Sequence, residues 1–232
     1  MRTIVVGDVH GCPRTFRALL DRVELDPACD RLVLLGDLLD RGPDAWQVWQ
    51  DCVALEQVMG ERFVLLLGNH EDLWLRRLSF PLWRMHRRVG RQATADSFRR
   101  HGVKVEACLP WFRERAALFW RGEGLQCAHA GVLVEPLEAN DREVLLHDHE
   151  AALRNEYPGP LTVIGHLALE DAVWLAGDGQ TMRVWPEGEA AALPDHGTLC
   201  IDTGCGKGGA LSALVVEGDR ALLYRQAELD VY

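Results

Sequence analysis

The chain has 232 residues, a formal net charge of −10 and 48% hydrophobic residues. This length and balance are typical of one globular domain and exclude disordered, collagen-like and coiled-coil chains. The acidic balance argues against stable nucleic acid binding, and no apolar stretch is long enough to cross a membrane, so we expect a cytoplasmic protein.

The first seventy residues alternate between apolar runs and helical patterns. Runs at 3–6, 32–35 and 63–67 are typical of buried parallel strands. Between them, apolar residues at helical spacing over 14–25 and 45–55 predict the connecting helices. This order of elements indicates an α/β fold.

The second half of the chain has a different pattern. Residues 71–120 are mostly helical in pattern and hold a cluster of arginines and tryptophans between Trp74 and Arg91. Short apolar runs separated by Gly and Pro then predict strands at 125–127, 161–164, 172–175, 182–185, 199–201, 213–216 and 221–224. The last two runs predict a hairpin. No repeat or linker marks a boundary, so we expect one domain over residues 1–232.

Polar side chains follow five of the predicted strands. In chain order they are Asp8 and His10; Asp37, Asp40 and Arg41; Asn69 and His70; His129; and His166. Ligands of α/β sheets bind at the carboxyl ends of the strands, so these loops are expected to converge. Carboxylate, imidazole and amide groups suit divalent metals, and five such loops can hold two ions that share one Asp. Any one of these loops alone is better explained as a turn or helix cap, but the five together favour a site.

Three of these loops carry motifs of a known family. Gly7-Asp8-Val9-His10-Gly11, Gly36-Asp37-Leu38-Leu39-Asp40-Arg41-Gly42 and Gly68-Asn69-His70-Glu71 appear in that order, followed by His129-Ala130-Gly131, Gly165-His166 and Ile201-Asp202-Thr203-Gly204. The chain thereby resembles the phosphoprotein phosphatases of the calcineurin-like metallophosphoesterase superfamily, in their compact bacterial form. The resemblance implies a four-layer α/β/β/α sandwich with two mixed sheets and a metal site at the carboxyl ends of the strands.

The resemblance also implies a role for each site residue. Asp8, His10 and Asp37 would bind one divalent ion, and Asp37, Asn69, His129 and His166 the other, with Asp37 bridging. The ions, expected to be Mn²⁺ with Fe/Zn or Ni/Co as alternatives, would activate a bridging water for in-line attack on phosphorus. His70 would protonate the leaving group, Asp40 would orient His70, and Arg41 would hold phosphoryl oxygens.

The chain departs from the family pattern at a second arginine that usually clamps phosphate. His147 and His149 occupy those places, and Arg142 and Arg154 are the arginines between His129 and His166. One interpretation is that His149 binds the substrate as a weaker clamp. The other is that both histidines lie on a solvated helix face and one of the two arginines reaches the site.

Two other features leave alternatives open. The arginine and tryptophan cluster could steer an anionic substrate, but solvated arginines with core tryptophans are the favoured interpretation. Asp202-Thr203-Gly204 is interpreted as a turn that leaves a strand near the site, because aspartic protease chemistry needs two such carboxylates.

The expected function is hydrolysis of a phosphoric ester, on a phosphorylated protein or a small phosphoester or nucleotide. A serine/threonine-type phosphoprotein phosphatase is the main expectation, because Asp40-Arg41 and Glu71 depart from the symmetrical diadenosine tetraphosphatase pattern. A diadenosine tetraphosphatase or a polynucleotide phosphatase is the alternative within the same chemistry. A catalytically inactive scaffold is a third possibility, which the complete set of metal residues and His70 disfavour.

Overall fold

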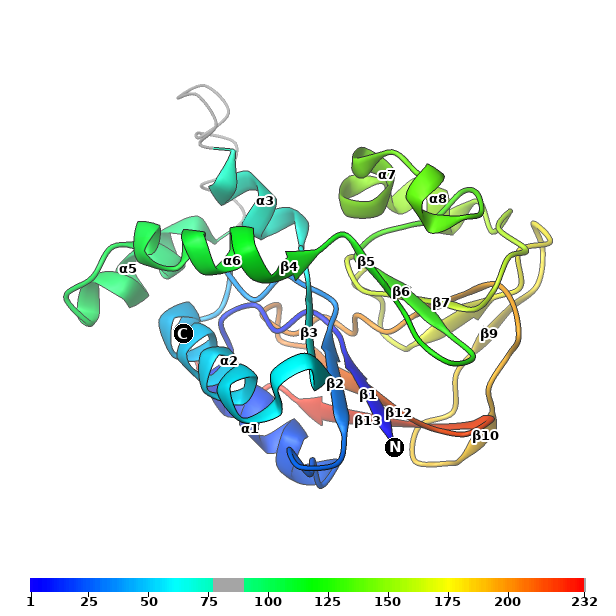
Figure 1. The fold of residues 1–232 in the computed structure, drawn as a ribbon, viewed down its shortest axis with the longest axis horizontal. Helices are drawn as coiled ribbons and strands as arrows, with labels where there is room; N and C mark the ends of the chain where they lie inside the picture. The colour runs from blue at the N-terminus through cyan, green and yellow to red at the C-terminus, as the bar shows by residue number, and fades with distance from the viewer. Residues whose placement is uncertain (77–89, 232) are drawn as a thin grey trace.

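The computed structural model describes residues 1–76 and 90–231. In this part of the chain two β-sheets pack face to face, and helices cover their outer faces (Figure 1). The order of layers is therefore helix, sheet, sheet, helix. The α/β/β/α sandwich with two mixed sheets that the sequence predicted is confirmed.

The first sheet has seven strands within the described ranges, in the order β10-β13-β12-β1-β2-β3-β4. Their bounds are β1 Thr3–Val6, β2 Arg31–Leu34, β3 Phe63–Leu66, β4 Ala116–Ala117, β10 Ala191–Ala192, β12 Ala210–Glu217 and β13 Arg220–Ala227. Strands β1, β2 and β3 are parallel neighbours, so their carboxyl ends meet at one edge. Strands β12 and β13 form the predicted hairpin, and β12 pairs antiparallel with β1.

The second sheet has six strands among the described residues, in the order β5-β6-β7-β11-β8-β9. Their bounds are β5 Phe119–Arg121, β6 Gln126–Ala128, β7 Thr162–Ile164, β8 Val173–Leu175, β9 Met182–Val184 and β11 Thr198–Cys200. Strands β6, β7 and β11 are again three parallel neighbours. Strand β4 also pairs parallel with β3, so the first sheet has four parallel strands and the second has three among the described residues.

The helices fill the outer layers and the loops between strands. Their bounds are α1 Pro13–Arg22, α2 Ala45–Met59, α3 Asn69–Leu75, α5 Arg91–Arg100, α6 Leu109–Arg115, α7 Arg142–His147 and α8 His149–Leu153. Three short 3₁₀ turns lie at Gly60–Arg62, Val105–Ala107 and Leu137–Ala139. Helix α2 begins at Asp44, whose carboxylate accepts the Gln47 backbone N–H, and ends at Gly60, where φ is +57°.

Within the described residues, three apolar cores lie between the four layers. Successive residues of a strand point to opposite faces of its sheet, so they belong to different cores. In β1, Ile4 and Val6 pack with α1 and α2 in the first core, whereas Val5 faces the second sheet. In β7, Val163 lies in the core between the sheets, while Ile164 packs under α7 and α8. Both faces of these strands are buried, which is why they appear in the sequence as continuous apolar runs.

The structure differs from the sequence prediction in two respects. The segment expected to be mostly helical, 71–120, also contains β4 and β5, and β10 was not predicted. Residues 77–89, which hold Trp83 and most arginines of the predicted basic cluster, lie outside the described residues. No described helix has the length and hydrophobicity of a membrane span.

Candidate metal centre

The five polar loops predicted from sequence converge on one buried site between the two sheets. Asp8, Asp37 and Asn69 follow β1, β2 and β3 of the first sheet. His129 and His166 follow β6 and β7 of the second sheet. The site therefore draws its residues from both layers of the sandwich.

The Asp37 carboxylate lies between two groups of ligand-type atoms. His10, Asp37 and His70 form one group, and Asp37, His129 and His166 form the other. In each group, one ligand atom per residue lies within 4.8 Å of the others. Nε2 of His10 is 3.6 Å from Asp37 Oδ2, and Nε2 of His129 is 3.5 Å from Asp37 Oδ1. The geometry thus gives Asp37 one oxygen on each side.

Backbone carbonyls fix the tautomers of two histidines. Nδ1 of His10 lies 2.9 Å from the Leu39 carbonyl oxygen, and Nδ1 of His129 lies 2.9 Å from that of Leu35. A carbonyl can only accept, so each Nδ1 carries the proton and each Nε2 presents a lone pair toward Asp37. This is the usual orientation of a metal-binding histidine.

Asn69, His166 and Asp8 make further polar contacts on the side of the site that holds His129. Oδ1 of Asn69 is 3.0 Å from Nε2 of His129 and 3.0 Å from Nδ1 of His166. The His166 backbone N–H donates to the Asp8 carboxylate, with N···O distances of 3.0 and 3.2 Å. The ends of β1, β3, β6 and β7 are thereby joined by direct polar contacts.

Burial keeps the histidines of the site in the neutral form that binds cations. Burial lowers the pKa of His10 and His129, and it lowers the pKa of His166 to about 3, so the imidazoles are neutral. Burial also raises the pKa of Asp8, and nearby Asp202 and Asp37 raise it further. Neutral imidazoles and crowded buried carboxylates fit divalent cations, which the resemblance implied.

His70 and Asp40 form a second, distinct arrangement beside Asp37. Nδ1 of His70 donates to Asp40 Oδ2 at 2.8 Å, and its Nε2 lies 3.8 Å from Asp37 Oδ2. Burial alone would lower the pKa of His70, but the Asp37 and Asp40 carboxylates raise it overall. His70 is therefore suited to carry a proton at Nε2, toward the centre of the site.

The Asp40 carboxylate is held by two further donors. Trp74 Nε1 and Thr94 Oγ1 each donate to Asp40 Oδ1 at 3.0 Å. The Arg91 guanidinium lies 4.1 Å from the centroid of the Trp74 ring. Trp74 and Arg91 of the arginine and tryptophan cluster thus support the Asp40–His70 pair.

The loop of Asp37 has an unusual backbone that Glu71 supports. Glu71 is fully buried and accepts the backbone N–H groups of Asp37 and Leu39 at 2.8 and 2.9 Å. Burial and the Asp37 charge raise the pKa of Glu71 to about 8. Gly68 is needed here, because a Cβ on it would lie 2.2 Å from the Asp37 backbone nitrogen. The Gly and Glu of the third motif therefore shape the second motif.

Backbone strain is concentrated at the site. Five of the seven non-glycine residues with positive φ in the described chain belong to it: His10, Asp37, Asp40, Arg41 and His166. Such conformations cost about 1–3 kcal/mol each and persist where surrounding contacts impose them.

The candidate substrate-binding groups lie at the rim. Nη2 of Arg41 is 3.5 Å from His70 Nε2. His149 is exposed at the start of α8, and its ring centroid is 6.0 Å from that of His166. The two arginines considered as alternatives are engaged elsewhere, because Arg142 and Arg154 pair with Asp72 and Asp148.

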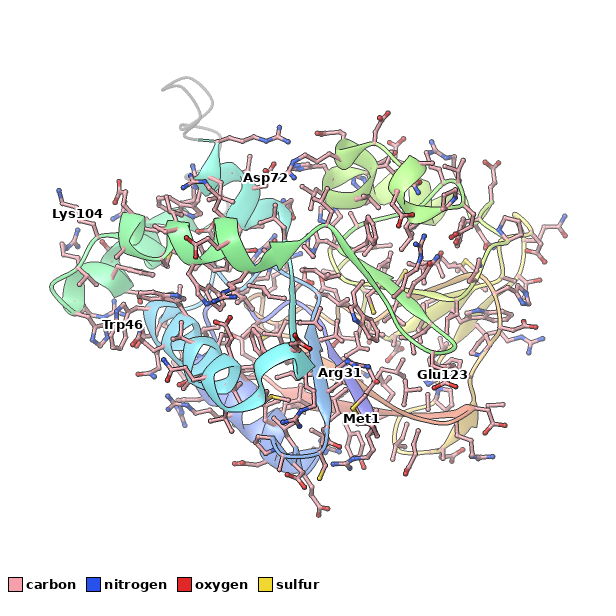
Figure 2. All side chains as sticks on the ribbon, viewed as in Figure 1. Met1, Arg31, Trp46, Asp72, Lys104 and Glu123 are labelled. Atoms are coloured by element: carbon pink, nitrogen blue, oxygen red, sulfur yellow. The ribbon has the colours of Figure 1, made fainter. Side chains whose placement is uncertain are left out.

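Asp72 joins helix α3, which carries His70, to helix α7. Figure 2 labels Asp72 on α3. Its buried carboxylate accepts hydrogen bonds from Arg142 and His147 and forms an ion pair with Arg76. Burial opposes this charge, but the three partners lower the pKa of Asp72 to about 2. His147 is therefore committed to a structural contact, unlike His149.

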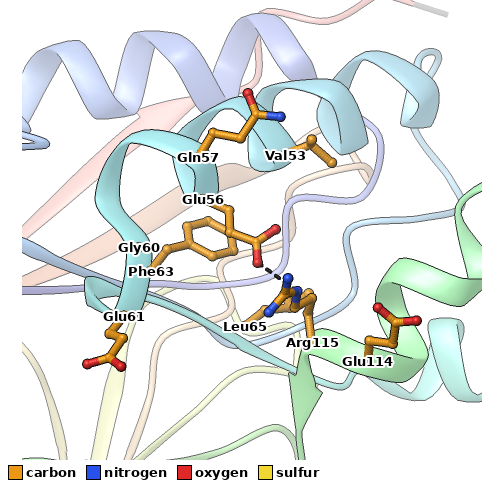
Figure 3. A pocket seen from close by; sticks show the side chains of 9 residues that line it. All are labelled: Val53, Glu56, Gln57, Gly60, Glu61, Phe63, Leu65, Glu114 and Arg115. Carbon is orange, nitrogen blue, oxygen red and sulfur yellow. Dashed lines mark ion pairs between the residues drawn. The ribbon is translucent and has the colours of Figure 1, made fainter.

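A separate hollow between α2, β3 and α6 contains none of these residues. It is lined by Glu56, Phe63 and Arg115 among others, and the Glu56 and Arg115 side chains pair at 2.9 Å (Figure 3). Among the described residues no histidine lines this hollow, and it lies away from the carboxyl ends of the strands, so we assign the chemistry to the metal centre.

Sequence reasoning gave no role to Glu71, Trp74, Thr94 or Asp202. The first three act through other residues, and their contacts depend on tertiary packing that spacing does not reveal. Asp202 lies in a block of the family resemblance and was interpreted as a turn near the site, without a role at the metals, although its position directly after a predicted strand is the signal that identified the other site residues.

The comparisons with known proteins agree with this geometry. The family model for calcineurin-like phosphoesterases matches residues 1–196. The chain belongs to the calcineurin-like phosphoesterase family. The superfamily inferred from the motifs is thus confirmed.

The sequence relatives are named as nucleotide hydrolases. The chain is 33% identical over 159 residues to a symmetrical bis(5'-nucleosyl)-tetraphosphatase of Pseudomonas putida, covering 65% of this chain and 51% of that protein. It is 31% identical over 156 residues to the protein of the same name from Aromatoleum aromaticum, covering 62% and 50%. The chain spans about half the length of these relatives.

Solved structures support the fold over the whole chain. A metallophosphoesterase from Sphaerobacter thermophilus superposes with a TM-score of 0.67 and 17% identity, covering 98% of this chain and 89% of that one. A protein serine/threonine phosphatase from Saccharomyces cerevisiae gives a TM-score of 0.60 and 13% identity, covering 100% and 81%. The likeness to the protein phosphatase is one of fold alone, so the comparisons favour the alternative function over the main expectation.

Proposed function

We propose that this chain hydrolyses dinucleoside polyphosphates, such as diadenosine tetraphosphate, at a centre of two divalent metal ions. The observation that carries the proposal is the similarity in sequence, at 33% identity, to proteins named symmetrical bis(5'-nucleosyl)-tetraphosphatases. The site supports it, because it offers two groups of ligand atoms that share Asp37.

The residues would divide between two metal positions. Asp8, His10 and Asp37 would hold one ion, and the other would lie against Asp37 and the residues Asn69, His129 and His166. Bound ions supply positive charge that activates water and stabilises phosphoryl oxygens, and Mn²⁺ is the ion we expect. Asp37 is placed for the shared position, because its two oxygens face His10 and His129 separately.

The chain's own residues supply binding and proton transfer. The Arg41 guanidinium next to His70 would hold phosphoryl oxygens with charge-assisted hydrogen bonds, and the exposed His149 would contact the outer part of the substrate. His70, protonated at Nε2 and oriented by Asp40, would give its proton to the oxygen of the departing nucleotide.

A phosphomonoesterase acting on phosphoproteins is the second candidate, favoured by the Asp40–His70 pair. An alkoxide leaving group is far more basic than a nucleoside phosphate and therefore needs proton transfer more. The 2.8 Å contact between the Asp40 and His70 side chains is well suited to supply it.

The test compares initial rates in the presence of Mn²⁺ on four substrate classes. These are diadenosine tetraphosphate, phosphoserine and phosphothreonine peptides, a phosphotyrosine peptide and a 5'-phosphorylated oligonucleotide. We expect the tetraphosphate to have the highest kcat/KM and to yield only nucleoside diphosphate by chromatography. A higher kcat/KM on a phosphopeptide would instead establish the second candidate, and preference for the oligonucleotide would contradict both.

A further inference from the structure

Six parallel strands end at the metal centre, and five of them provide the residues described above. The sixth is β11, which pairs in parallel with β7 in the register Cys200 to Ile164. The Ile201 backbone N–H continues this pairing by donating to the Ile164 carbonyl at 2.9 Å. Asp202 lies two residues after the end of β11, and His166 lies two residues after the end of β7. The same register therefore places Asp202 beside His166.

Asp202 is fixed between the loops of two metal-site residues. Its carbonyl accepts the Leu169 N–H at 3.0 Å, in the loop that follows His166. On the other side a Cβ on Gly7, the residue before Asp8, would lie 3.7 Å from the Asp202 Cα. The backbone of Asp202 therefore packs against the carboxyl end of β1 as well as that of β7.

The Asp202 side chain is buried and only partly used in local contacts. It is 3% exposed, and Oδ1 accepts the Gly204 N–H at 2.9 Å. The other oxygen accepts no hydrogen bond within residues 1–76 and 90–231. Burial and the charge of Asp37 raise the pKa of Asp202, and Asp202 in turn raises that of Asp8. The backbone contacts of Asp202 with the loops after β1 and β7 thus bring a further buried carboxylate to the strand ends that carry Asp8 and His166.

The charge of the implied ligand set is small for two divalent ions. Only two of its six members, Asp8 and Asp37, are carboxylates, and the three histidines and Asn69 are neutral. A further buried carboxylate beside them offsets part of the excess positive charge that the ions bring.

We propose that Asp202 is an outer carboxylate of the metal centre, a positioning residue that raises the affinity for divalent cations without coordinating them. The proposal rests on the proposed two-metal function. It differs from the interpretation of Asp202 as a simple turn residue, which needs only the hydrogen bond from Gly204.

The test uses the pair Asp202→Asn and Glu228→Gln. Both substitutions remove one charge and keep the side-chain shape, and both residues cap glycine amides of the same loop. Glu228 accepts the N–H groups of Gly206 and Gly208 at 2.9 and 2.8 Å. Glu228→Gln is therefore a matched control for the effect of altering this loop.

Mn²⁺ titrations of chelator-treated protein by isothermal calorimetry give the first readout. For Asp202→Asn we expect an affinity about 10–100-fold weaker with two ions still bound, as for other residues that support metal ligands. For Glu228→Gln we expect the affinity of the parent. Unchanged affinity in Asp202→Asn, equal weakening in both variants, or loss of one bound ion in Asp202→Asn would each overturn the proposal.

Thermal unfolding gives a second readout that does not depend on activity. Without metal, Asp202→Asn should unfold at the same or a higher temperature than the parent, because a buried repulsion with Asp8 is removed. With Mn²⁺, its gain in Tm should be smaller than that of the parent. A lower Tm without metal and an undiminished gain would show a purely structural role. Failure of the parent to bind Mn²⁺ would instead refute the proposed function.

Discussion

Replacing Asp40 by Asn tests the assignment of His70 as the proton donor. The substitution keeps the side-chain size and leaves an oxygen that can accept from Trp74 and Thr94. It removes the negative charge that faces His70 Nδ1 at 2.8 Å. The Asp40 charge is one of the causes that raise the pKa of His70, so its loss lowers that pKa.

The expected size of the effect follows from this one contact. A hydrogen bond to a charged group contributes about 1.5–3 kcal/mol, and 1.36 kcal/mol corresponds to one pKa unit. The pKa of His70 should therefore fall, with that energy as the upper limit of the effect, because neutral His70 also donates its Nδ1–H. His70 acts in its protonated form, so the alkaline limb of the kcat profile should move to lower pH by the same amount. At pH values above the alkaline limbs of both proteins, the rate of Asp40→Asn should be up to about 10–100-fold lower than that of the parent. At pH values below both limbs, the two rates should approach one another.

The assay is kcat against pH with saturating Mn²⁺ and substrate, together with the metal content of each protein. Bound cations lower the pKa of His70 in parent and variant alike, so the difference between their limbs is the quantity to compare. Trp74→Phe is the control, because it removes one neutral donor to Asp40 and keeps the charge. An unshifted limb in Asp40→Asn, or a loss of metal, would refute the role given to this pair.

Four further substitutions address the other roles. His70→Asn should retain two metal ions and lose about 10²–10⁴-fold in kcat on an alkyl phosphate, with a smaller loss on a dinucleoside tetraphosphate; equal losses would count against proton donation. Asp37→Asn should lose both turnover and stoichiometric metal, as measured by elemental analysis, because its oxygens face both groups of ligands. Asp72→Asn should lower the free energy of unfolding by about 2 kcal/mol at pH 7, because the pKa of Asp72 in the folded protein is lowered to about 2. In urea unfolding, this difference from the parent should persist above the pKa of Asp72 in the unfolded chain and vanish as the pH falls through about 2. His149→Ala should raise KM several-fold with little change in kcat, whereas an unchanged KM would remove it from the substrate site.

Most of the fold could be predicted because its strands are buried on both faces. Such strands leave continuous apolar runs, and Thr3–Val6 and Phe63–Leu66 were found in this way. Strands β4, β5 and β10 have two or three residues each, too few to set a period. They pair at the sheet edges with β3, β6 and β13, and this pairing is tertiary information.

The metal residues could be predicted because strand ends that carry ligand-type side chains converge at one edge of each sheet. Their supporting contacts could not be predicted in the same way. Glu71 accepts the backbone N–H of Asp37 in another loop, and the Trp74 side chain of α3 donates to Asp40 in the loop after β2. The expectation of a phosphoprotein substrate rested on Asp40-Arg41 and Glu71, whereas overall sequence similarity favours the nucleotide hydrolases.

The division of the centre between both halves of the sandwich has a consequence for the lifetime of the protein. Asp8, Asp37 and Asn69 belong to one sheet and His129 and His166 to the other, so cations held by them form a noncovalent cross-link through the middle of the molecule. Ligands that bind only the native state stabilise it by RT ln(1 + L/Kd), which grows with the free concentration L of the ligand. Scarcity of metal would thus remove activity and, at the same time, expose the chain to unfolding and proteolysis, so that the amount of protein follows the supply of the ions it uses.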